Sequence, residues 1–190
     1  MKAYRSLLCV ALVAAGLLAV AESPAQDTKA TPAPQGGKDM TAKEFMAKLV
    51  GDYNVVRVFY GTTPDAPKKM NGTCKQFMSY NNFLFSEFSF GEGDAKITGL
   101  GILGYQEDTG LFISNWLDSR QTKMSIRQSK QKFDGKQIEL ATGVAKLDKS
   151  ARTSRTITVF EDDGKKVWHR QWNMVNDKEQ LWMELHMTRK

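Results

Sequence analysis

The segment GLGILGYQEDTGLFISNW, residues Gly99 to Trp116, decides the fold of this chain. Its first six residues match G-x-G-x-x-G, the pattern that binds a dinucleotide pyrophosphate, and Asp118 follows at about the spacing of a ribose-binding acid. That site requires a helix beginning within the glycine run, but here an acidic turn and a second apolar run follow. The segment therefore predicts a β-hairpin and no nucleotide cofactor. Gly99 would face Trp116 and make room for its indole, and Leu103 would face Phe112.

The rest of the chain after Gly51 has the same character. Runs of eight to ten residues, rich in aromatic and β-branched types, alternate with Gly, Asn and Asp pairs, which is typical of strands joined by hairpins. We expect strands at 53–60, 72–80, 83–90, 97–105, 111–118, 122–131, 137–143, 153–161, 166–175 and 179–188. A short helix is expected at 42–49, because Thr41 and Glu44 have the spacing of a capping box.

About ten hairpin-linked strands with one apolar face are too many for a flat open sheet. Rolling the sheet into a cylinder buries that face and removes the edges. The sequence therefore predicts an all-β fold, an antiparallel up-and-down lipocalin-like barrel of about ten strands with a short N-terminal helix.

Two turns near the C-terminus predict which residues face the interior. With Asp163-Gly164 as a turn, Val159 would pair with Trp168 and Ile157 with Arg170. With Asp177-Lys178 as the next turn, Trp172 would pair with Met183, Arg170 with Leu185 and Trp168 with Met187. The mostly apolar face would point inward. The opposite face, with residues such as Thr158, His169, Gln171, Glu184 and His186, would be the outer wall.

A third turn is expected at Asn81-Asn82, between two strands that are apolar on both faces. The outer apolar face needs a cover, which either the N-terminal helix or a second subunit in a homodimer would provide.

The stretch Gly99 to Ser119 also resembles a known family. Gly104-Tyr105, the acidic turn to Gly110, Trp116 followed by Asp118-Ser119, and the terminal Thr188-Arg189-Lys190 are similar to DUF1579, a family of uncharacterised bacterial proteins. The similarity extends over residues 40–190. Tyr53 stands where the family usually has Trp, and Met187 where it tends to have Tyr. The resemblance implies a calycin-like barrel and assigns no functional residues.

The N-terminus has the pattern of an export signal. A basic start is followed by the apolar run Leu7 to Ala21, which is shorter than the roughly 20 residues of a membrane-spanning helix. Cleavage is expected after Ala21 or Ala25. We therefore expect a signal peptide at 1–25, a flexible linker at 26–38, a single barrel domain at 39–190 and a periplasmic or secreted protein. The mature chain would keep one cysteine, Cys74, and so no internal disulfide.

The candidate ligand-binding residues follow from the predicted inner face. Arg170 would be an inward cation that holds the acidic group of an amphiphilic ligand, between the indoles of Trp168 and Trp172. The remaining candidates for this apolar wall are Trp116 and Phe112. Alternatively, Arg170 would lie near the rim or pair with an internal acid such as Glu87.

The metal-binding hypothesis is weaker. His169 and His186 would lie opposite each other near Glu184, which suggests a zinc site, but on a solvated face without a dependable further ligand. A solvated cross-strand pair is the favoured interpretation, and no metal is expected.

Charge and motifs limit the remaining functions. The net charge is +6, and 120–155 contains ten basic and three acidic residues, which suggests either contact with an anionic envelope surface or a solvated strand face. Nucleic-acid binding is not expected, because aromatic residues do not interleave with this charge. No G-x-S-x-G, H-E-x-x-H or P-loop motif occurs. The sequence thus favours an exported, non-catalytic protein that binds a small apolar or amphiphilic ligand. The alternative is a self-filled barrel that acts as an envelope interaction module.

Overall fold

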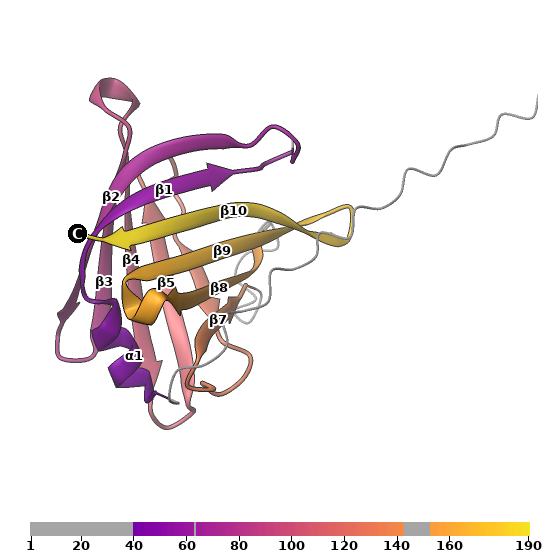
Figure 1. Ribbon diagram of the computed structural model, residues 1–190. Coiled ribbons are helices and arrows are strands. Elements are labelled where there is room, and N and C mark those ends of the chain that lie inside the picture. Colours follow the sequence, from indigo (N-terminus) through magenta and orange to yellow (C-terminus); the bar gives the residue numbers. More distant parts are fainter. Residues whose placement is uncertain (1–39, 63, 143–152) are drawn as a thin grey trace, which may run out of the picture. The chain divides into compact units, whose positions relative to one another are not determined.

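The computed structural model describes residues 40–62, 64–142 and 153–190, and within them ten strands close into an antiparallel barrel (Figure 1). Each strand pairs with its neighbours in sequence, and β1 pairs with β10 to close the ring. The all-β, up-and-down barrel predicted from the sequence is confirmed. The strands are β1 (Gly51–Phe59), β2 (Lys68–Ser79), β3 (Phe83–Phe90), β4 (Ile97–Gln106), β5 (Leu111–Asp118), β6 (Ser125–Gln128), β7 (Gln137–Ala141), β8 (Thr153–Glu161), β9 (Lys166–Val175) and β10 (Lys178–Arg189).

The helix α1 (Ala42–Leu49) lies at the end of the barrel where β1 begins and β10 ends (Figure 1). Its capping box is formed as predicted: Thr41 accepts a hydrogen bond from the backbone of Glu44, whose side chain accepts one from the backbone of Thr41. The helix buries Phe45, with its neighbours Met46 and Leu49, in the same apolar cluster as the barrel interior. It therefore plugs one end of the barrel.

Hydrogen bonds from the last strand fix the C-terminal end of α1. Arg189 donates to the carbonyl oxygens of Lys48 and Val50 and to the hydroxyl of Tyr53. The Tyr53 hydroxyl in turn donates to the carbonyl of Leu49, 2.7 Å away. These bonds satisfy helix-terminal carbonyls that have no partner within the helix. Two short 3-10 turns, η1 (Gly93–Ala95) and η2 (Asp162–Gly164), complete the described elements.

The glycine-rich segment is a strand, as predicted, since β4 runs through the whole GLGILG stretch. The predicted pairing was wrong by two residues: Gly99 pairs with Asp118, and Gly101 with Trp116. The reason is the turn, in which Gly110 takes φ +73° and the loop comprises residues 107–110. Trp116 nevertheless leans over Gly99, so the packing role predicted for this glycine is correct.

The two C-terminal hairpins differ in how well their pairing was predicted. In β8–β9 Val159 pairs with Trp168 and Ile157 with Arg170, as expected. In β9–β10 the predicted pairing was wrong. The turn falls at Asn176-Asp177, both with positive φ, and an irregularity follows between Leu181 and Met183. As a result Arg170 pairs with Glu184, His169 with Leu185, and Trp168 with His186.

The third hairpin leaves aromatic side chains on the outside. Residues 80–82 form its loop, and Phe83 after it is 43% exposed. Because α1 plugs the barrel end and Tyr80 and Phe83 stay exposed, the helix, one of the two predicted alternatives, does not cover this face.

The N-terminal segment is not part of the described structure. The predicted signal peptide (1–25) and linker (26–38) both lie outside the described residues. Within the described residues, no helix is both long and apolar enough to cross a membrane.

Candidate ligand-binding site

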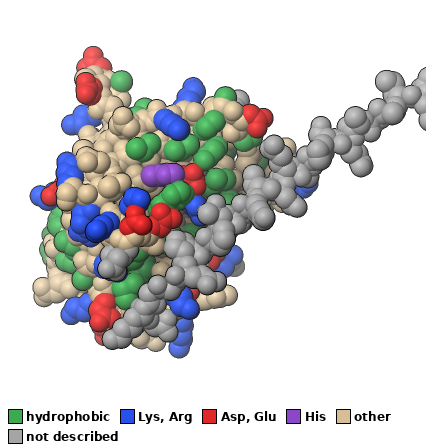
Figure 2. Space-filling view, viewed as in Figure 1, with side chains coloured by type: hydrophobic (Ala, Val, Ile, Leu, Met, Phe, Trp, Pro, Cys, Tyr) green, Lys and Arg blue, Asp and Glu red, His purple; other side chains and the backbone are tan. Residues whose placement is uncertain are grey.

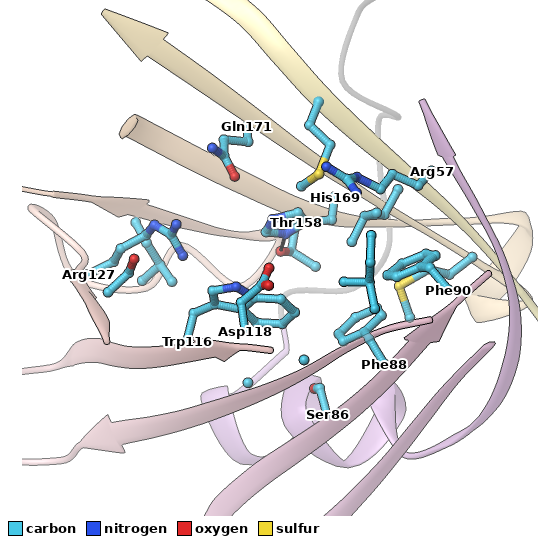
Figure 3. A pocket seen from close by; sticks show the side chains of 18 of the residues that line it. Arg57, Ser86, Phe88, Phe90, Trp116, Asp118, Arg127, Thr158, His169 and Gln171 are labelled. Atoms are coloured by element: carbon cyan, nitrogen blue, oxygen red, sulfur yellow. Dashed lines mark hydrogen bonds between the residues drawn. The ribbon is translucent and has the colours of Figure 1, made fainter. Parts of the chain in front are cut away.

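The barrel contains a cavity of about 850 Å³ (Figure 3). Its walls combine large apolar side chains with polar and charged ones from all parts of the ring. The apolar part includes Leu84, Phe88, Phe90, Leu103, Trp116, Ile138, Leu140, Val167, Leu185 and Met187. The polar part includes Arg57, Gln76, Ser86, Asp118, Arg127, Thr158, His169 and Gln171. The interior is therefore amphiphilic.

Three buried polar atoms in this lining have no hydrogen-bond partner among the described residues. They are Nε of Arg57, Nε of Arg127 and Oε1 of Gln76. The amide nitrogen of Gln76 does have a partner, since it donates to Ser86 at 2.8 Å. Buried polar groups are nearly always hydrogen-bonded, so three such atoms around one cavity mark groups available to a bound molecule or water.

The carboxylate of Asp118 in this cavity is already engaged. It accepts hydrogen bonds from the guanidinium of Arg120, with Nε 2.8 Å from Oδ1, and from the backbone of Arg120. Burial by itself would raise the pKa of Asp118, but the bonds from Arg120 outweigh it and leave that pKa lowered. Asp118 is thus an ionised partner of Arg120 and not a proton donor at neutral pH.

His169 contributes a neutral imidazole to the wall. Burial, and after it the charge of Arg127, lowers the pKa of His169 to about 4. Its Nδ1 shares a hydrogen bond of 2.9 Å with the hydroxyl of Thr158, its cross-strand partner on β8. At physiological pH His169 is therefore a polar, uncharged group.

Three predicted site residues lie on the outer wall instead of the inside. Because Val167, His169 and Gln171 face the cavity, strand alternation places Trp168, Arg170 and Trp172 on the opposite face. The guanidinium of Arg170 lies 4.7 Å from the Trp168 ring centre, and its Nε donates to Glu184 at 2.9 Å. Figure 2 shows the face over β1, β9 and β10, where histidine, acidic and basic side chains gather beside hydrophobic ones.

The predicted inner face was inverted in β8–β9 because the rule that apolar residues point inward assumes a filled interior. Here the polar residues Thr158, His169 and Gln171 line a hollow space. The alternative prediction that Arg170 pairs with an internal acid such as Glu87 was also wrong, since its partner is Glu184 on the outer wall.

The predicted histidine pair does not form. His169 faces the cavity and lies beside Leu185, while His186 is on the outer wall, where its ring centre lies 4.2 Å from that of Trp168 with the rings tilted by 36°. Nε2 of His186 lies 3.2 Å from Glu184. Among the described residues, no group of three His, Cys, Asp or Glu side chains is placed to hold a metal ion.

The other two predicted residues lie on the inside. Trp116 forms part of the cavity wall, against Phe88 at 5.5 Å between ring centres. Phe112 is 1% exposed and packs against Tyr105 and Phe133, in the apolar core and not among the cavity-lining residues.

Sequence reasoning missed the charged residues of the interior, although one signal was present. Arg57 stands in an alternating row with Tyr53, Val55 and Phe59, so it had to share their face. Arg127 gave no such signal, because β6 is only four residues long.

This fold and site define a class: an antiparallel β-barrel that is plugged at one end and hollow inside. Within that class, the chain belongs to the DUF1579 family, described as proteins of unknown function, whose model matches residues 38–189. Among solved structures it is similar to Rv2717c from M. tuberculosis, with a TM-score of 0.57 and 15% identity over 80% of this chain and 99% of the other. That similarity shows the fold alone. No curated protein matches the chain.

Proposed function

We propose that this protein is a non-catalytic binding protein that holds a small apolar or amphiphilic ligand inside its barrel. The observation that carries the proposal is the cavity of about 850 Å³, whose wall contains three buried polar atoms without a hydrogen-bond partner in the described parts of the chain. Ligand sites typically measure roughly 300–1,000 Å³ and combine apolar walls with a few polar groups. A barrel filled by its own side chains would close-pack and leave no such space.

The state of two potentially reactive groups supports a function without catalysis. Burial raises the pKa of the Cys74 thiol above its ordinary value, so the thiolate nucleophile is disfavoured. Asp118 is held by Arg120. Cavity binding without chemistry fits these side chains better than nucleophilic or acid–base catalysis.

We further propose that the protein is exported, on the basis of the N-terminal pattern of residues 1–25. Mass spectrometry of the protein from its native host should find a mature N-terminus at Glu22 or Gln26. An intact N-terminus in the cytoplasmic fraction would contradict export.

Native mass spectrometry tests the binding function directly. Protein purified from its own host should carry a co-purifying small molecule that is released on denaturation. A matched pair of variants locates it: Gly101→Leu places a leucine side chain in the cavity wall, whereas Asn115→Leu places the same side chain on the outer face of the adjacent strand. We expect Gly101→Leu to lose the ligand and Asn115→Leu to keep it. Equal occupancy in both folded variants would argue against binding in the cavity.

A second candidate function rests on the basic residues that line the cavity. Lys68, Lys69, Arg120 and Lys123 are exposed and line it from loop or strand-end positions. These cations favour contact with an anionic envelope surface, which would also place the cavity near a source of amphiphiles. Binding to vesicles that contain anionic lipid should weaken as salt rises, and salt-insensitive binding would contradict this role.

A further inference from the structure

Arg127 is a cation of the barrel interior whose charge is incompletely compensated within the part of the chain that the structure describes. It lies on β6, lines the cavity, and has a buried Nε without a partner among the described residues (Figure 3). Burial lowers the pKa of Arg127 to about 10, which still leaves the guanidinium charged at neutral pH. A buried charge without a counter-ion is costly, so the site favours a bound anion.

A second guanidinium of the interior, that of Arg57, is also incompletely compensated. Its Nε has no partner among the described residues, and it contacts the ring of Phe59 at 5.1 Å from the ring centre. Asp118 is the acid that acts on it, but that carboxylate is hydrogen-bonded to Arg120. Burial lowers the pKa of Arg57, and the repulsion from Arg120 exceeds the attraction of Asp118. The cavity thus has an excess of positive charge.

The surroundings of Arg127 restrict the kind of anion. The charge of Arg127 acts on His169 and helps to keep it uncharged, so His169 with Thr158 offers hydrogen bonds but no further charge. Phe88 and Trp116 present an apolar wall in the same cavity. A small inorganic ion would leave this wall without a partner, whereas a molecule with an acidic end and an apolar body uses both parts.

We propose that the ligand is an amphiphilic anion whose carboxylate or phosphate is bound by Arg127 and whose apolar body lies against Trp116 and Phe88. Arg57 adds to the positive charge of the same cavity wall. This inference rests on the proposed function and specifies the charge of the ligand and the residue that holds it. Guanidinium groups bind carboxylate and phosphate through paired, charge-assisted hydrogen bonds, so either head group fits.

The experiment compares four probes with one dodecyl chain and different head groups. Dodecanoate, dodecyl phosphate, dodecanol and dodecylammonium are titrated into the wild-type protein by calorimetry below their aggregation concentrations. We expect the better of the two anions to bind at least about tenfold more tightly than dodecanol, and dodecylammonium to bind most weakly. The ratio of the two anions distinguishes a carboxylate from a phosphate ligand.

Matched variants assign the preference to one residue. Arg127→Met removes the interior charge, whereas Arg155→Met removes the same charge from the outer wall, where Arg155 pairs with Glu179. We expect Arg127→Met to reduce anion affinity at least about tenfold with little change for dodecanol, and Arg155→Met to change neither. Circular dichroism checks that both variants fold.

The outcomes separate the two proposals. If dodecanol binds the wild type as tightly as both anions, or if folded Arg127→Met keeps the anion preference, the assignment of Arg127 is wrong while cavity binding stands. If none of the four probes binds and no co-purifying molecule is found, the proposed function fails, and the inference with it. The wild-type comparison needs no variant, so a folding defect in Arg127→Met cannot hide a negative result.

Discussion

The indole of Trp116 lies against Gly99, so that a Cβ atom at Gly99 would overlap the ring. Gly101, the residue that pairs with Trp116, has more room, since its own Cβ would come no closer than 3.5 Å to any neighbour. The glycines of the GLGILG stretch thus shape the wall of the cavity.

Replacing Gly99 with Ala should force Trp116 from its position. We expect a loss of about 1–3 kcal/mol in the free energy of unfolding, which is usual for an overpacked site, and a changed tryptophan emission. Gly101→Ala is the control and should stay within about 1 kcal/mol of the wild type. Urea denaturation followed by circular dichroism measures both, and equal stability of the two variants would contradict the packing role of Gly99.

Arg189→Met should loosen the helix that plugs the barrel. The variant loses the hydrogen bonds to the carbonyl oxygens of Lys48 and Val50 and to the Tyr53 hydroxyl. We expect a loss of about 2–3 kcal/mol in the free energy of unfolding, because these are charge-assisted bonds. Hydrogen exchange in α1 should be faster in the variant than in the wild type, with a smaller change in the middle of the sheet. Unchanged exchange in α1 would contradict the role of Arg189.

His169 should make the protein less stable in mild acid. Its pKa is lowered to about 4 in the folded protein, while an unfolded chain has the ordinary value of about 6.5. As the pH falls from about 6.5 to about 4, the unfolded chain binds a proton that the folded protein does not, so stability decreases. We expect a loss of up to about 3 kcal/mol across this range. Denaturation of His169→Gln should show a flatter pH profile there, and an identical profile would contradict this account.

Arg170→Met tests the correction of the binding site. Glu184 is 8% exposed and accepts hydrogen bonds from Arg170 and from the hydroxyl of Tyr60. Losing one of them should cost about 1–3 kcal/mol of stability. Ligand binding should not change, because Arg170 lies outside the barrel. If the variant bound the ligand more weakly but kept wild-type stability, Arg170 would be part of the binding site after all.

The outer aromatic face next to the β2–β3 turn is expected to be covered by a second copy of the chain. Phe77 and Phe85 stack there at 5.6 Å, and Tyr80 and Phe83 are exposed. Light scattering at increasing concentration should detect a dimer, and Phe83→Glu should shift it to monomer. A wild-type monomer at all concentrations would contradict this prediction.

Much of the fold could be predicted because periodicity and turn chemistry act locally. The bounds of α1, β3, β5, β8 and β9 match the expected ranges, since Gly, Asn and Asp interrupt the alternation at their ends. Pairing was harder to predict. One irregularity between Leu181 and Met183 shifts the pairing register of all later residues in β10, and no residue type at this point predicts it.

The site was predicted less well for a different physical reason. An alternating apolar pattern predicts which face of a strand is buried in a packed core. It does not predict which face lines a cavity, because polar residues can line a cavity. Thr158, His169 and Gln171 therefore look like an outer wall in sequence and form an inner one in the structure. The charge of Arg170 is satisfied by Glu184, which only the true pairing of β9 with β10 brings close.

The pairing of β1 with β10 has a consequence for how the protein is made. The two strands that close the ring are the first and the last of the described strands, and Arg189 bonds to the carbonyls at the end of α1. A nascent polypeptide therefore cannot complete the ring until β10 has left the ribosome. Contacts so distant in sequence slow folding, so the closed chamber is the last part of the barrel to form.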